Sequence, residues 1–269
     1  MRYTQKTIDN LDLELYILGD DGDLAGEEIP EYVQDIHNIS SGWLGFNTPF
    51  EAEQYLIGIA FDDVPYVPVK LDYDKLTHAI EDVLTKAQAV LPLEEIDIVV
   101  IPTIHPVVLE KFNGVAGYTS DHKTILLNLA HDNSFTQKEL KARLVQMYNH
   151  LFLREQWNTL LDSIINEGLA IHFANQLVKG YEHPYQAILT EGQQTKILGQ
   201  IKQYLNSSDQ QVYDELFLGE GEFPFGAGYT IGYKIIEMFQ QAEPTKNWKE
   251  ILQLDPHYIT VRALGKKEI

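Results

Sequence analysis

The chain has 269 residues, enough for one large domain or two small ones with a sizeable core. Twenty basic residues against 40 acidic ones give a formal charge of −20, which repels phosphate backbones and anionic lipid, so we expect neither nucleic acid nor membrane surfaces as partners. The absence of cysteine excludes disulfides and Cys-based zinc sites and fits a reducing compartment. With no signal-peptide pattern and no apolar run of about 18 residues, we expect a soluble, cytoplasmic protein.

Residues 1–71 form an N-terminal segment whose fold the sequence leaves open, either as part of the main domain or as a separate cap. A short apolar run covers Leu13–Leu18 and is followed by the acidic stretch Gly19–Asp23. This stretch lacks the spaced ligands and the closing Glu of a calcium loop, so we interpret it as a solvated turn. Pro30 is expected to open a helix.

From Asp72 onward, apolar residues at helical spacing predict a helix that ends before Pro92, and the β-branched run Ile96–Ile101 predicts a buried strand. A short helix after Pro106 and two short strands follow. These two strands are Gly114–Thr119 and Thr124–Leu129. The remaining chain is expected to be helical, with predicted helices at Thr136–Trp157, Leu160–Val178, Tyr185–Leu205, Tyr229–Ala242 and Trp248–Leu252. The order predicts an α+β fold over residues 72–262, with a small, mostly antiparallel sheet packed on a helical lobe and the Thr136–Trp157 helix at its centre.

Three short stretches carry a resemblance to a known family: Gln146-Met147-Tyr148-Asn149-His150, Asn166-Glu167-Gly168-Leu169-Ala170, and Gly228-Tyr229-Thr230-Ile231-Gly232-Tyr233. In this order they resemble the YjaZ-like family of predicted bacterial zinc-dependent proteases, over roughly Asp72 to Leu254. The resemblance implies a zincin-like, gluzincin-type architecture. One helix of that family carries His-Glu-x-x-His and the next carries a Glu as third ligand. Two His four residues apart share a helix face and reach one Zn²⁺, and the Glu acts as general base.

Carried over position by position, the motif is degenerate. Gln146 stands at the first His position, and Met147, which has no proton to exchange, stands at the general-base position. His150 and Glu167 match the second His and the third ligand. Gln is a weak, neutral ligand for Zn²⁺, and losing the base forfeits a rate factor of about 10²–10⁴. We therefore expect a catalytically inactive, metalloprotease-like protein with no required cofactor, although zinc remains possible.

Several alternatives stay open at these positions. His150 and Glu167 either hold a metal together with Gln146, as in an atypical metal-dependent peptidase, or form an ion pair or hydrogen bond. Arg154 is a further candidate to neutralise Glu167. Met147 fits an apolar stripe of core residues.

The resemblance also bears on two tyrosines and on a partner. In the resembling family a Tyr near Tyr229 and Tyr233 donates to the oxyanion of the transition state, whereas ordinary helix-interface tyrosines explain the same pattern. We expect strand Thr124–Leu129 to offer an edge to an extended peptide or protein segment, because edge-strand addition needs only main-chain hydrogen bonds. A purely structural role is the third alternative.

Overall fold

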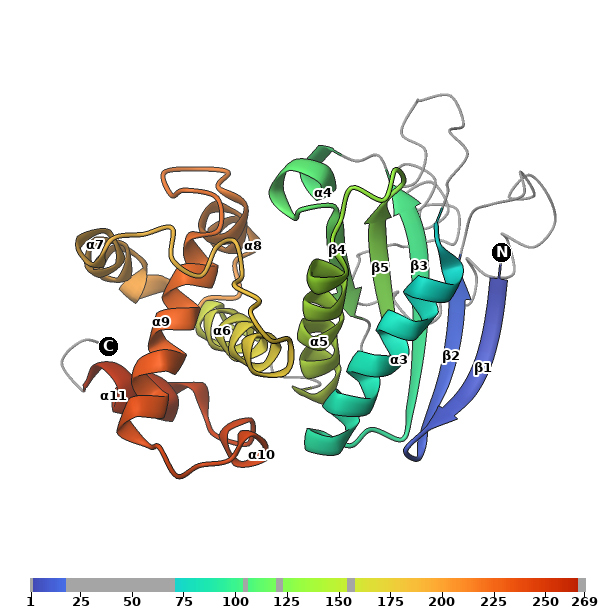
Figure 1. The fold of residues 1–269 in the computed structure, drawn as a ribbon. Coiled ribbons are helices and arrows are strands. Elements are labelled where there is room, and N and C mark those ends of the chain that lie inside the picture. Colours follow the sequence, from blue (N-terminus) through green and yellow to red (C-terminus); the bar gives the residue numbers. More distant parts are fainter. Residues whose placement is uncertain (1, 18–70, 104–105, 120–122, 154–157, 266–269) are drawn as a thin grey trace. The chain divides into compact units, whose positions relative to one another are not determined.

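The computed structural model describes residues 2–17, 71–103, 106–119, 123–153 and 158–265 (Figure 1). The chain divides into two compact units, Met1–Arg154 and Glu155–Ile269, and each unit is described by itself. The predicted solvated turn at Gly19–Asp23, the predicted helix at Pro30, and Arg154 lie outside the described residues.

The first unit is built on a five-stranded sheet with the order β1-β2-β3-β5-β4. Its strands are β1 (Arg2–Ile8), β2 (Leu11–Ile17), β3 (Glu95–Thr103), β4 (Val115–Thr119) and β5 (Thr124–Ala130). The pairs β1–β2 and β4–β5 are antiparallel, whereas β2–β3 and β3–β5 are parallel. The predicted α+β class is confirmed, and the sheet is mixed rather than mostly antiparallel.

The mixed sheet follows from the connections. A parallel pair needs a crossover, and helix α3 (Tyr73–Val90) lies on the connection from β2 to β3. Strand β5 returns beside β3, and β4 pairs on the far side of β5. Thr124–Leu129 is therefore an interior segment and the prediction that it offers a free edge was wrong. Among the described strands, the edges of the sheet are β1 and β4.

The sequence left open how the N-terminal segment folds, and the structure shows the fold of its residues 2–17. Strands β1 and β2 form a hairpin whose turn residues Asp9 and Asn10 have φ of 46° and 67°. Positive φ at both central residues is the geometry of the hairpin turns that match strand twist, and Asp and Asn tolerate it. Because β2 pairs with β3, this hairpin belongs to the same sheet as the later strands.

Helix α5 (Gln137–Leu153) and helix α3 lie side by side on one face of the sheet (Figure 1). Asp72 caps the start of α3, where its side chain accepts from the Lys75 amide, and Thr136 precedes α5, where its Oγ1 accepts from the Glu139 amide. Nearly every residue of α5 from Leu140 onward is buried. The short helix α4 (Pro106–Lys111) completes the described part of this unit.

Tyr148 ties α5 to the end of α3. Its hydroxyl lies 2.5 Å from Gln88 Oε1 and 2.8 Å from the Leu91 carbonyl, and the side chain is fully buried. Burial raises the pKa of Tyr148, so the hydroxyl keeps its proton and acts as a donor there.

The described residues of the second unit form helices and the turns between them, with no strand among them. Helices α6 and α9 form its centre, and the elements are α6 (Leu160–Leu177), α7 (Glu191–Ile201), the 3₁₀ turn η2 (Lys202–Tyr204), α8 (Gln210–Tyr213), the π-helical turn η3 (Asp214–Leu218), α9 (Ala227–Ala242), α10 (Trp248–Ile251) and α11 (Pro256–Leu264). The predicted helices at Leu160 and Tyr229 are confirmed. α8, η3 and α11 were not predicted.

Two glycines let α6 and α9 approach to backbone contact. A Cβ placed on Gly168 would lie 2.3 Å from the Gly232 carbonyl oxygen, and one on Gly232 would lie 2.1 Å from the Ile164 carbonyl oxygen. Any side chain at either position would collide with main chain, which does not yield as a side chain can. Throughout the described residues, none of the helices is long and apolar enough to cross a membrane.

Candidate functional site

Helix α5 carries the two residues predicted for the first half of a metal site. Gln146 and His150 stand four residues apart, which places them on the same helix face. Their side chains are buried, with 1% and 5% of their surface exposed. Within the first unit, α5 packs against β4 and β5 of the sheet and against α3 beside it, which contributes to this burial.

Arg143, one turn before Gln146, is the residue that sequence reasoning missed. Its Nη1 donates to Gln146 Oε1 at 2.7 Å and its Nε donates to the Val115 carbonyl at 3.3 Å. The guanidinium also lies over the Phe112 ring, 5.1 Å from the ring centroid, and only 7% of Arg143 is exposed. The i, i+3 spacing of Arg143 and Gln146 was the signal available in the sequence.

Met147, at the position predicted for the general base, packs beneath β4. Only 5% of its surface is exposed. A Cβ placed on Gly117 of β4 would lie 2.6 Å from Met147 Cγ and 3.2 Å from Arg143 Cγ. The missing side chain at Gly117 therefore lets α5 approach the strand closely, and the thioether fills the space as core packing.

Glu167, the predicted third ligand, lies in the second unit on α6. It is 9% exposed and precedes the contact glycine Gly168. Thr159 caps this helix: its hydroxyl accepts from the Asp162 amide, and Asp162 accepts from the Thr159 amide in return. Gln146 and His150 belong to the first unit, so a metal site or an ion pair that joins them to Glu167 stays a prediction.

The two predicted oxyanion donors lie on α9 in different surroundings. The Tyr229 ring is 7% exposed and packs against the rings of His183, Tyr185 and Phe217, with centroid distances of 5.3, 6.0 and 5.1 Å. Tyr233 stacks on His172 with ring centroids 4.2 Å apart. Burial raises the pKa of Tyr233, which keeps its hydroxyl protonated. Their role as oxyanion donors stays a prediction.

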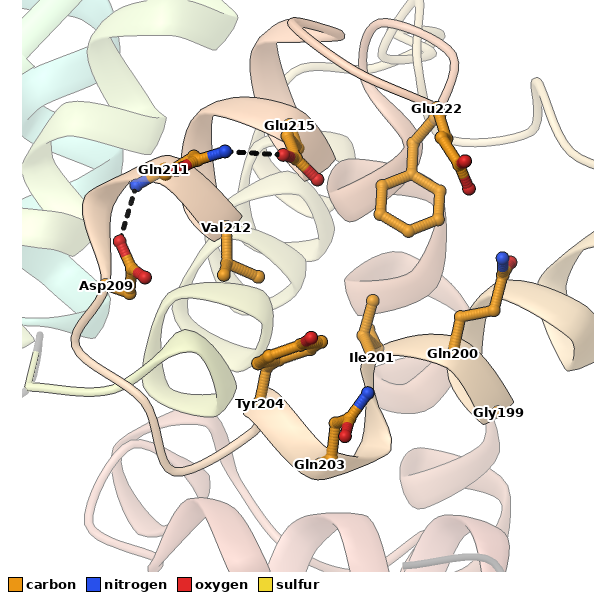
Figure 2. Close-up of a pocket in the computed structure, with 11 residues that line it drawn as sticks. Gly199, Gln200, Ile201, Gln203, Tyr204, Asp209, Gln211, Val212, Glu215 and Glu222 are labelled. Carbon is orange, nitrogen blue, oxygen red and sulfur yellow. Dashed lines mark hydrogen bonds between the residues drawn. The ribbon is translucent and has the colours of Figure 1, made fainter.

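A polar hollow of about 510 Å³ in the second unit holds none of the predicted site residues. It is lined by parts of α7, η2, α8, η3 and the turn after η3 (Figure 2). Gln211 bridges two carboxylates of the hollow. Its main-chain N–H donates to Asp209 Oδ1, and its side-chain Nε2 donates to Glu215 Oε1. Those hydrogen bonds connect residues of the wall to one another. The hollow is therefore a separate feature from the predicted site residues on α5.

The residues present on α5 do not fit the zinc ion that the resemblance implies. A neutral amide oxygen is a poor ligand for Zn²⁺, and Gln146 Oε1 already accepts a hydrogen bond from a guanidinium. A second cation at the same oxygen would be repelled at contact distance inside a buried site. The methionine beside it supplies no group for proton transfer.

A comparison with protein-family models gives a match that covers most of the chain. Residues 76–260 match the model of a family described as Predicted Zn-dependent protease (DUF2268). A search of curated proteins finds no match. The matched residues include all of α5, α6 and α9, which carry the three stretches on which the resemblance was based. The chain belongs to the DUF2268 family of predicted zinc-dependent proteases.

Proposed function

We propose that this protein is a member of the family that has lost hydrolysis and binds an extended peptide or protein segment at the edge of its sheet. The observation that supports the loss of hydrolysis is the buried hydrogen bond from Arg143 to Gln146. It commits the amide oxygen at the predicted first-ligand position to an internal cation. Met147, buried under Gly117, adds to it, because the predicted general base is replaced by core packing.

The main-chain groups of strand β4 support the proposal that an extended segment binds at the edge of the sheet. The Ala130 amide donates to the Gly114 carbonyl, so the alternation of an antiparallel pair turns the main-chain groups of Ala116 and Tyr118 toward β5. Those of Val115, Gly117 and Thr119 then point away from β5. Outward main-chain groups on an edge strand are what an added strand pairs with.

The test of lost hydrolysis is metal content and proteolysis on the full chain, purified without a metal-affinity tag. We expect far less than one zinc per chain by mass spectrometry and no chelator-sensitive cleavage of an unfolded protein substrate. The alternative is an atypical peptidase with Gln146, His150 and Glu167 as ligands. Near-stoichiometric zinc that disappears in His150→Ala would establish that alternative and refute ours.

The test of edge binding uses a matched pair of variants at Thr119. Proline lacks the amide proton and is tolerated on edge strands where that proton points outward. Thr119→Pro should therefore abolish peptide binding while leaving the β4–β5 pairing in place, and Thr119→Val, which keeps the amide, should bind like the wild type. Equal binding by both variants would show that peptides do not pair with β4.

A further inference from the structure

Arg143 is a buried cation, and the described part of the chain places no anion in contact with it. Among the residues that the structure describes, it contacts the Val115 carbonyl, the Gln146 amide oxygen and the Phe112 ring, and none of these carries a charge. A guanidinium has five N–H donors, and these contacts use two of its nitrogens. A buried charge that lacks a partner of opposite sign is strongly destabilising, so retaining one needs a reason.

Gln146 adds a second donor at the same place. Its Oε1 accepts from Arg143, and its Nε2 is buried without a hydrogen-bond partner in the described part of the chain. Only 1% of the residue is exposed. A buried donor left unsatisfied costs about 1–3 kcal/mol. Among the described residues, these two side chains therefore have more donors than acceptors and no anionic acceptor. A carboxylate supplies acceptor oxygens and negative charge together.

The hydrogen bonds at the start of β4 determine which end of an added strand reaches Arg143. Both main-chain groups of Val115 that point away from β5 are already used: its amide donates to the Phe112 carbonyl, and its carbonyl accepts from Arg143 Nε. An added strand therefore has Gly117 and Thr119 to pair with, and its pairing stops at Arg143. In an antiparallel pair, the end that arrives at Val115 is the C-terminus of the added segment.

We infer that Arg143, together with Gln146 Nε2, binds the C-terminal carboxylate of an extended peptide that pairs antiparallel with β4. The inference rests on the proposed function, since it specifies which end of a bound segment is recognised. Charge-assisted hydrogen bonds from a guanidinium to a carboxylate are frequently bidentate. The carboxylate would then supply the anion that the guanidinium lacks among the described residues.

The experiment compares two synthetic octapeptide pools of random sequence, one with free C-terminal carboxylates and one with C-terminal amides. Both are passed over the immobilised full chain at ~0.15 M salt, where the Debye length of about 8 Å screens the overall acidic charge. Enriched peptides are identified by mass spectrometry and made in both forms. Dissociation constants are then measured for the wild type, Arg143→Met, Arg143→Lys and Arg262→Lys, the last altering a surface ion pair with Glu243 as control.

We expect the free acid to bind the wild type and Arg262→Lys at least about tenfold more tightly than the amide, a change equivalent to 1.4 kcal/mol. Arg143→Met should lose that preference and Arg143→Lys should keep part of it. Equal binding of acid and amide by the wild type overturns the inference and leaves edge binding standing. A preference for the acid that survives in Arg143→Met also overturns it.

Two further readouts separate this inference from the proposed function and from misfolding. If no octapeptide of either pool binds the wild type, both are wrong. If the acid preference persists in Thr119→Pro, carboxylate recognition stands and strand pairing fails. If Arg143→Met does not fold, the NMR signals of the arginine Nε–Hε groups in the wild type supply the test. The chain has four arginines, so the signal that is absent from Arg143→Lys is assigned to Arg143. That signal must shift when the acid form of the peptide is added and must stay in place when the amide is added.

Discussion

His172 is held in its neutral form by the packing of the second unit. Its ring stacks on Tyr233, and its Nε2 lies 2.9 Å from the Tyr233 carbonyl, to which it donates in the neutral tautomer. Burial lowers the pKa of His172 and outweighs the opposing effects of that hydrogen bond and of Glu237. The folded state therefore resists a proton that the unfolded chain accepts below about pH 6.5, and the contribution of His172 to stability falls as the pH drops through that value.

His172→Phe keeps a stacked ring but removes both the titration and the hydrogen bond. We expect it to be less stable than the wild type at pH 7.5 by about 1 kcal/mol, the usual net value of one hydrogen bond, and this deficit should shrink as the pH falls to 5. Urea unfolding at both pH values measures it. Tyr233→Phe retains the ring and His172, so it should follow the pH dependence of the wild type. A deficit for His172→Phe that is the same at both pH values would show that His172 does not titrate on unfolding.

At the scale of elements, the crossing of α6 and α9 is the contact least tolerant of change. Gly232→Ala would place a methyl group 2.1 Å from the Ile164 carbonyl oxygen, so the two helices must separate. We expect a loss of about 3 kcal/mol in the free energy of unfolding, at the upper end of the usual range for overpacking. Gly199→Ala is the matched control, because a Cβ there meets nothing within 4 Å and a helical Ala should gain about 0.5–1 kcal/mol over Gly. Equal effects of the two substitutions would contradict the close approach.

The elements were largely predictable because their signals are local. The period of apolar residues predicted α3, the run of β-branched residues predicted β3, and the capping pattern at Thr136 predicted α5. The neighbours of β5 were not predictable from the same signals. Alternation and composition identify a strand, whereas its place inside the sheet depends on which strands pair, and β5 was wrongly placed at an edge for that reason.

In the candidate site, too, features set by sequence spacing were predictable and contacts made through the fold were not. Gln146, Met147, His150 and Glu167 were found because motif spacing is a property of the sequence, and the structure buries all four. The Arg143–Gln146 hydrogen bond lies within one helix turn and was accessible to the same reasoning. The packing of Met147 under Gly117 was not, because it joins residues thirty positions apart through the fold rather than through local periodicity.

At the scale of the whole molecule, the formal charge of −20 opposes folding, since compaction brings like charges together. Salt screens this repulsion, and it also weakens attractive surface pairs such as Lys6–Glu81 and Lys86–Asp82. Exposed pairs contribute only about 0.2–1 kcal/mol each before screening, so at pH 7 the relief of repulsion should dominate. We expect the urea midpoint to rise when NaCl is raised from about 0.02 to 0.5 M, over which the Debye length falls from tens of ångströms to a few.

The same titration near pH 4.7, the isoelectric point of the sequence, supplies the control. There the net charge is close to zero, and salt screens only the attractive pairs. The urea midpoint should then stay constant or fall as NaCl rises, with an unchanged slope of the free energy against urea at both pH values. A midpoint that rises equally at pH 7 and at pH 4.7 would mean that NaCl acts through hydration rather than through charge, and that the acidic excess has no measurable effect on the folded state.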